Sequence, residues 1–282
     1  MRWRQAAVRG ALAALYFLAI AVTMAFLVLP VVAIFAHVPL GRLLRQLSNP
    51  IVTDALIVSL KTVAISQLVI LLLGTPTAYF LASRRFRGRP LLVTFVELPI
   101  VLPPAVAGIG LIVAFGRFGL LGSTFDFLGI DVSFNQTAVV LAITFVSGPF
   151  YVRQAIASFE AVDKRLIAAS RTLGAGPTRT FFRVTLPLAR GGLTAGEAIS
   201  LARGLGEFGA TIMFAGSLQG VTQTLPLAVY TTFEAQNGLD VALAISAVLV
   251  IVSLAILLAL KGGGLWESSR PAVTAIAQPD TE

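Results

Sequence analysis

The chain has 282 residues, of which 57% are hydrophobic and 12% are charged, and its formal net charge at pH 7 is +8. Soluble globular domains carry about 25% charged residues, so this composition excludes an ordinary soluble protein and indicates several membrane spans. The sequence has no cysteine and a single histidine, His37, which excludes disulfides, thiolate catalysis and a histidine-built metal site. We therefore expect no metal ion and no cofactor.

Six apolar runs are long enough to cross a hydrocarbon core of about 30 Å as helices. In chain order they cover residues 11–36, 56–82, 91–115, 137–157, 193–215 and 241–260. This pattern predicts an all-α, polytopic membrane protein with about six transmembrane helices. The expected transmembrane domain covers 11–260, with a cytoplasmic N-terminus at 1–10 and a flexible cytoplasmic tail at 261–282.

The basic residues predict the orientation of these helices. Most of the 21 Lys and Arg residues lie in segments that would be cytoplasmic if the N-terminus is inside, whereas Arg42, Arg45 and Arg117 would lie outside. Because cytoplasmic loops carry the excess of positive charge, we expect both termini in the cytoplasm. The net positive charge then reflects topology and contact with the lipid bilayer, and no nucleic-acid partner is expected.

Three prolines interrupt the third predicted span. Pro99, Pro103 and Pro104 lack the backbone N–H that an α-helix needs, and their rings clash with the preceding turn. Carbonyl groups freed at membrane depth are tolerated only against protein or a wet cavity. We therefore expect this span to line a pathway, with a kinked packing helix as the alternative.

The segment 158–190 is the longest hydrophilic stretch between the predicted spans. Apolar or small residues recur in it at helical spacing: Leu166, Ala169, Ser170 and Leu173. They predict a short amphipathic helix that begins near Asp163 and ends at Gly174. A second short helix is expected to start at 176–177 and to stop at Pro187. These two helices would form a compact unit on the cytoplasmic face, and a loop lying among lipid headgroups is the alternative.

The fifth predicted span combines small residues with charges. The small residues repeat at every fourth position and allow close helix approach: Gly192, Gly196, Ser200 and Gly204. Arg203 and Glu207 stand four apart and can pair along one helix face, either as a structural ion pair or as a gate. The candidates for the pathway or its gate are Pro99, Pro103, Pro104, Ser147, Arg203, Glu207 and Thr211.

The 158–190 segment resembles the EAA loop, the cytoplasmic motif of ABC importer permeases. Two stretches carry the resemblance. The first is Arg171, Thr172, Leu173, Gly174 and Ala175, and the second is Val184, Thr185, Leu186 and Pro187. Nine residues stand between Gly174 and Val184. Ala168 stands where the glutamate of the motif is expected. The resemblance implies that these residues dock on an ATPase subunit: Ala168, Ala169, Arg171, Thr172, Leu173, Gly174, Ala175, Phe181, Val184, Leu186 and Pro187.

Other runs resemble the permeases for tetrahedral oxyanions. These runs are residues 98–104, 145–149 and 206–211. Within that group, residues 212–216 and 222–230 are most similar to the molybdate permeases. This resemblance implies molybdate as the substrate and tungstate as a second substrate. Sulfate and thiosulfate permeases share much of these sequence motifs, so sulfate or thiosulfate is the alternative substrate.

The resemblance implies a type I ABC importer (MetI-like) permease fold in a bacterial cytoplasmic (inner) membrane. It also implies the partners: two copies of an ABC ATPase subunit, a second permease copy in a homodimer, and a periplasmic or lipoprotein substrate-binding protein.

The sequence has no phosphate loop of the G-x-x-x-x-G-K-[ST] type, so we expect a transport subunit and no enzyme. The G-x-G-x-x-G match at 204–209 lies in an apolar span and lacks the strand that gives it meaning. An ATP-independent secondary transporter and a membrane scaffold are the alternative functions. A secondary transporter would more often show two inverted halves, and a scaffold would need neither a pathway nor broken helices, so the EAA-like loop at 158–190 favours the permease.

Overall fold

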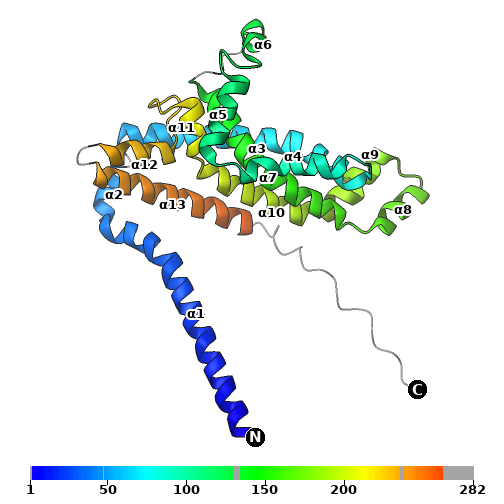
Figure 1. Ribbon diagram of the computed structural model, residues 1–282, viewed down its shortest axis with the longest axis horizontal. Helices are drawn as coiled ribbons and strands as arrows, with labels where there is room; N and C mark the ends of the chain where they lie inside the picture. The colour runs from blue at the N-terminus through cyan, green and yellow to red at the C-terminus, as the bar shows by residue number, and fades with distance from the viewer. Residues whose placement is uncertain (1, 47, 130–131, 133, 236–237, 263–282) are drawn as a thin grey trace.

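The computed structural model describes residues 2–46, 48–129, 132, 134–235 and 238–262. In this part of the chain there are helices and connecting segments but no strand (Figure 1). The helices are α1 (Arg2–His37), α2 (Leu40–Gln46), α3 (Pro50–Ser83), α4 (Arg89–Val101), α5 (Pro104–Phe115), α6 (Gly122–Phe127), α7 (Gln136–Glu160), α8 (Lys164–Thr172), α9 (Pro177–Thr180), the π-helix η1 (Phe181–Thr185), α10 (Leu186–Leu205), α11 (Gly209–Ala215), α12 (Leu225–Glu234) and α13 (Leu239–Gly262).

Four of the described helices are long and apolar enough to cross a membrane by themselves. They are α3, α7, the Leu12–His37 part of α1 and the Leu239–Ala259 part of α13. These helices correspond to the first, second, fourth and sixth predicted spans, and the all-α membrane fold is confirmed. Since α1 begins at Arg2, residues 2–10 continue the first span as helix, while 263–282 of the expected tail lie outside the described residues.

The third predicted span is a broken pair of helices. α4 and α5 pass the same test together but are bent by 116°. The bend follows from Pro103 and Pro104, because a proline forces the residue before it into extended backbone, and both Leu102 and Pro103 are extended, with ψ angles of 131° and 136°. Pro99 lies inside α4, where it removes one backbone hydrogen bond without ending the helix, so the sharp bend comes from Pro103 and Pro104 alone.

The fifth predicted span is also interrupted. α10 ends at Leu205 and α11 begins at Gly209, so the expectation of one helix over 193–215 is wrong. Gly206 caps α10, and Phe208, with a non-helical φ of −131°, separates the two helices. α10 carries Arg190, Glu197 and Arg203 and is not among the described helices that are long and apolar enough to cross a membrane by themselves.

The body of the molecule is a bundle in which α7 lies between α3 and α10 (Figure 1). The small-residue face predicted on α10 packs against α7. A Cβ atom at Gly196 would come within 2.9 Å of the Gln154 Cβ atom, and the Ser200 hydroxyl donates to the Ser147 carbonyl at 3.0 Å. Close approach of the two backbones therefore requires this repeat, as predicted.

The remaining helices extend from the bundle. α8 and α9 lie at one end of it, and α2 and α12 lie at the other (Figure 1). α5 and α6 project sideways, and α1 runs away from the body without a buried residue between Leu12 and His37. In a bilayer the apolar side chains of α1 would therefore contact lipid or another chain.

Candidate functional site

The first helix of the 158–190 loop forms as predicted. Asp163 caps α8, and its Oδ1 atom accepts a hydrogen bond from the Arg165 amide at 2.8 Å. At the other end Gly174 has a φ of +83°, in the left-handed region. The amide of Ala175 donates to the Ser170 carbonyl at 3.1 Å and that of Gly174 donates to the Arg171 carbonyl at 2.9 Å. These two bonds form a Schellman motif, which reverses the chain after α8.

The second half of the loop differs from the prediction. α9 starts at Pro177 as expected, but the chain then passes through η1 directly into α10, and Pro187 lies in the first turn of α10 instead of stopping a helix. Proline has no N–H for the usual i−4 bond, and the wider π-turn, in which the Leu186 amide donates to Phe181, accommodates this loss. The loop is consequently continuous with a 20-residue helix.

Aromatic side chains attach the loop to the bundle. The ring of Phe181 lies 4.6 Å from that of Tyr79 on α3, and Tyr79 lies 5.4 Å from Phe159 at the end of α7. The two halves of the loop are joined by a hydroxyl pair, since Ser170 Oγ lies 3.2 Å from Thr180 Oγ1 and Thr180 is buried. The loop is therefore held at its base by apolar packing.

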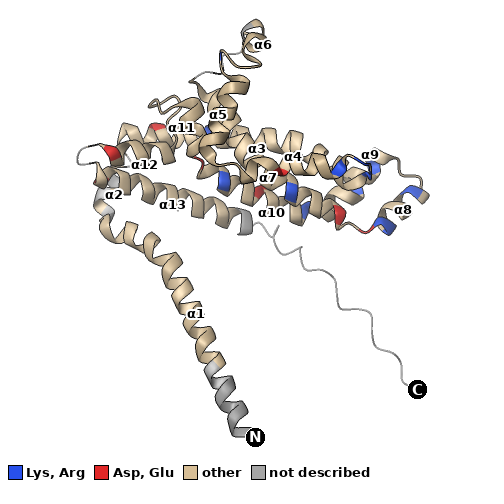
Figure 2. Cartoon of the chain, in the orientation of Figure 1, with Lys and Arg blue, Asp and Glu red and all other residues tan. Residues whose placement is uncertain are grey.

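The outer helix of the loop is left uncovered. No residue of α8 is buried, Leu166 is 48% exposed and Leu173 is 88% exposed. α8 also carries Lys164, Arg165 and Arg171, and Figure 2 shows most of the Lys and Arg residues at the end of the bundle that carries α8 and α9. An exposed apolar stripe of this kind on a positioned helix is suited to docking on another protein.

The two broken spans meet in the structure. α5 packs against α11, so the Pro103–Pro104 bend lies beside the break at 206–208. A Cβ atom at Gly209 would come 2.5 Å from the Pro104 Cβ atom, which shows how closely the two chains approach. Sequence reasoning named both regions as pathway candidates, but their contact could not be deduced from their positions in the chain.

Arg203 and Glu207 span the break between α10 and α11. Arg203 Nη1 lies 2.7 Å from Glu207 Oε2, and the Glu207 side chain is only 1% exposed. Glu207 Oε1 also accepts a hydrogen bond from the Ala210 amide at 2.8 Å, so the same carboxylate caps α11. The sequence indicated the pair and missed the cap, because a glutamate two residues before a helix is a weak capping signal. Thr211, in the first turn of α11, is fully buried.

Ser147 occupies a packing position on α7. It is fully buried, and its hydroxyl donates to the Ile143 carbonyl of its own helix at 2.6 Å. Its carbonyl accepts from Ser200 Oγ, which also lies 3.1 Å from Gln67 Oε1 on α3. Gln67 was not singled out from the sequence, although an amide inside a long apolar run is a usable signal of a buried polar contact.

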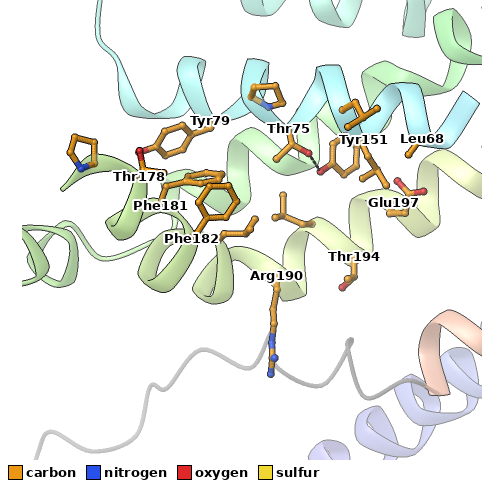
Figure 3. A pocket seen from close by; sticks show the side chains of 16 residues that line it. Leu68, Thr75, Tyr79, Tyr151, Thr178, Phe181, Phe182, Arg190, Thr194 and Glu197 are labelled. Carbon is orange, nitrogen blue, oxygen red and sulfur yellow. Dashed lines mark hydrogen bonds between the residues drawn. The ribbon is translucent and has the colours of Figure 1, made fainter. Parts of the chain in front are cut away.

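A groove of about 900 Å³ lies between α3 and α10, with the loop residues Phe181 and Phe182 at one end of it (Figure 3). Most of its lining is apolar, and the polar side chains that reach it include Thr75, Tyr151 and Glu197. Thr75 Oγ1 lies 2.6 Å from Tyr151 Oη, and Phe181 and Phe182 form the end of the groove next to the loop. Movement of the loop would therefore change the shape of this groove.

The comparisons with known proteins agree with these features. Residues 70–262 match the family described as binding-protein-dependent transport system inner membrane component. The molybdenum transport system permease protein ModB of Mycobacterium tuberculosis is 44% identical over 235 residues, which cover 83% of this chain and 88% of that protein. ModB of Escherichia coli strain K12 is 41% identical over 186 residues, or 66% of this chain and 81% of that protein.

Solved structures give the same fold at low sequence identity. A bacterial alginate ABC transporter, crystallised with an alginate-bound periplasmic protein, matches with a TM-score of 0.75 and 15% identity, over 95% of this chain and 98% of that one. The inward-facing MetNI methionine ABC transporter matches with a TM-score of 0.60 and 20% identity, over 78% and 97%. The chain therefore has the type I ABC importer permease fold and belongs to the family of inner membrane components of binding-protein-dependent transport systems.

Proposed function

We propose that this chain is the membrane-spanning permease subunit of an ABC importer that carries molybdate, and tungstate as a second substrate, into the cytoplasm. The observation that carries the proposal is the exposed helix α8, which the Schellman turn at Gly174 joins to α9, and α9 continues through η1 into α10 of the bundle. The substrate is supported by the 44% identity to a protein named for molybdenum transport.

In this proposal the 158–190 loop and both termini face the cytoplasm. The gathering of Lys and Arg at the α8–α9 end of the bundle supports this orientation, because positive loops remain on the cytoplasmic side (Figure 2). Two copies of the permease would bind two ATPase subunits there. A periplasmic or lipoprotein substrate-binding protein would deliver the oxyanion at the opposite end.

The proposed transport step follows the course of the chain. When the ATPase subunits close, they displace α8, and α9 and η1 pass that displacement to α10, which is about 30 Å long. α10 ends at the Arg203–Glu207 pair, and the following α11 contacts the Pro103–Pro104 bend through Gly209. The contact between the two broken spans is the gate in this scheme, and no covalent chemistry is needed in the permease.

Reconstitution tests the proposal. The chain alone in proteoliposomes should hydrolyse no ATP above the lipid background, because its sequence has no phosphate loop. With its ATPase and binding protein it should take up radiolabelled molybdate only when ATP is present, and excess tungstate should compete. ATP hydrolysis by the isolated chain would contradict the assigned role, and competition by sulfate but not tungstate would reassign the substrate.

Glu207 should be needed for stability at the gate. Glu207→Ala removes the partner of Arg203 and the acceptor of the Ala210 amide, so we expect the free energy of unfolding to fall by about 3 kcal/mol. Denaturant unfolding of the detergent-solubilised chain measures this. Glu207→Gln keeps an oxygen for Ala210 and should lose clearly less, whereas equal stability of Glu207→Ala and wild type would refute the capping role.

A further inference from the structure

Two ion pairs of opposite polarity join α4 to α7. At one end Arg89, the first residue of α4, pairs with Glu160, the last residue of α7. Further along, Glu97 of α4 lies 3.4 Å from Arg153 of α7. The cation is on α4 in the first pair and on α7 in the second, and a shift of one helix along the other would separate both pairs at once.

Arg89 makes a second contact in addition to the ion pair. Its Nε atom donates to the carbonyl of Leu81, near the end of α3, at 2.7 Å. A cation in the first turn of α4 opposes the dipole of its own helix, whereas the C-terminal carbonyls of α3 carry partial negative charge and attract it. One guanidinium group thus binds the ends of α3 and α7 together with the start of α4.

Packing fixes α4 less firmly than it fixes the core helices. None of its residues is fully buried, and Val93 and Val96 pack, partly buried, against the apolar cluster formed by α3, α7 and α10. Partly exposed ion pairs contribute little to global stability. The Arg89–Glu160 pair has a larger effect on the position of α4 than on stability. The planar guanidinium group of Arg89 binds in a defined direction, so it specifies where α4 starts relative to α7.

The position of this contact links the loop with the pathway. Glu160 stands three residues before Asp163, the cap of α8, and between them Val162 is buried in the bundle. The other end of α4 is Val101, followed directly by the bend into α5. α4 is therefore a second connection between the loop and the gate, separate from α10.

We infer that Arg89 is a positioning residue of the transport cycle: through Glu160 and the Leu81 carbonyl it makes α4 follow the 158–190 loop, so that the Pro103–Pro104 bend moves when the ATPases close. This inference rests on the proposed function. The gate is then driven from both sides, by α10 through α11 and by α4 through α5.

A charge-swap cycle in the complete transporter tests the inference. Arg89→Glu, Glu160→Arg and the double variant are reconstituted with the ATPase and binding protein, and molybdate uptake is measured per ATP hydrolysed. Each single reversal should lower this ratio by about fivefold, with complex assembly unchanged. The ratio of the double variant should be higher than two independent losses of that size would give, because the swapped pair restores the attraction. A purely structural role would lower uptake and hydrolysis together and leave the ratio unchanged.

The second ion pair supplies the matched control. Arg153 and Glu97 have side chains that are 67% and 37% exposed, and neither lies next to the loop, so Glu97→Arg and Arg153→Glu should change the ratio less. If the wild-type complex transports molybdate while the Arg89 and Glu160 variants keep its ratio, the inference is wrong and the proposed function stands. A wild-type complex that takes up no oxyanion would contradict both the proposed function and the inference about Arg89.

Discussion

Replacement of Gly174 by valine is expected to leave the chain inserted in the membrane but unable to retain its ATPase subunits. At a φ of +83° a β-branched side chain is strained by about 1–3 kcal/mol, and relief of that strain would open the Schellman turn. α8 would then lose its fixed direction relative to α9, and the docking stripe of Leu166 and Leu173 would be misplaced. Co-purification of the ATPase with the tagged permease, together with ATP-dependent molybdate uptake, measures the loss.

Gly176→Val is a close control for this experiment. A Cβ atom would meet nothing within 4 Å at either Gly174 or Gly176, so steric contact does not distinguish the two positions. Gly176 has a φ of −66° and a ψ of 168°, a conformation that valine adopts readily and that suits a residue before proline. Gly176→Val should therefore bind ATPase as wild type does. Full uptake by Gly174→Val would show that the turn does not position the docking helix.

The local parts of the loop could be predicted because their signals are local. Asp163, the helical spacing from Leu166 to Leu173 and the left-handed turn at Gly174 all act within one or two helical turns. The prediction that a helix stops at Pro187 is wrong, because proline is compatible both with the first turn of a helix and with a helix end. The π-helix before it decides between these two, and a π-turn has no clear sequence signal.

The spans show a similar division between local and tertiary information. Hydropathy identifies α3 and α7, since it needs only length and composition. It does not give the 116° direction change between α4 and α5, nor the contact of Pro104 with Gly209, which depends on how separate segments pack. The Arg89–Glu160 pair joins residues 71 positions apart and could not be inferred from one sequence.

The contact between the two broken spans should tolerate no added side chain on the buried face of α5. Gly108→Ala would place a Cβ atom 2.6 Å from the Met213 Cβ atom and 2.9 Å from the Ala210 carbonyl oxygen. Neither atom can move by a side-chain rotation, so α5 and α11 must separate, at a cost of about 1–3 kcal/mol. We expect a lower unfolding midpoint of the solubilised chain and, if this contact is the gate as proposed, a large loss of ATP-dependent uptake.

Gly110→Ala, two residues along the same helix, separates crowding from helix propensity. A Cβ atom at Gly110 would meet nothing within 4 Å. Alanine favours a helix over glycine by about 1 kcal/mol, so Gly110→Ala should match or exceed the wild-type midpoint and keep its uptake. A normal midpoint with normal uptake in Gly108→Ala would mean that α5 and α11 can separate without consequence, and the gate would then have to lie elsewhere in the bundle. If Gly108→Ala keeps its midpoint but loses uptake, the contact serves transport and contributes little to the stability of the fold.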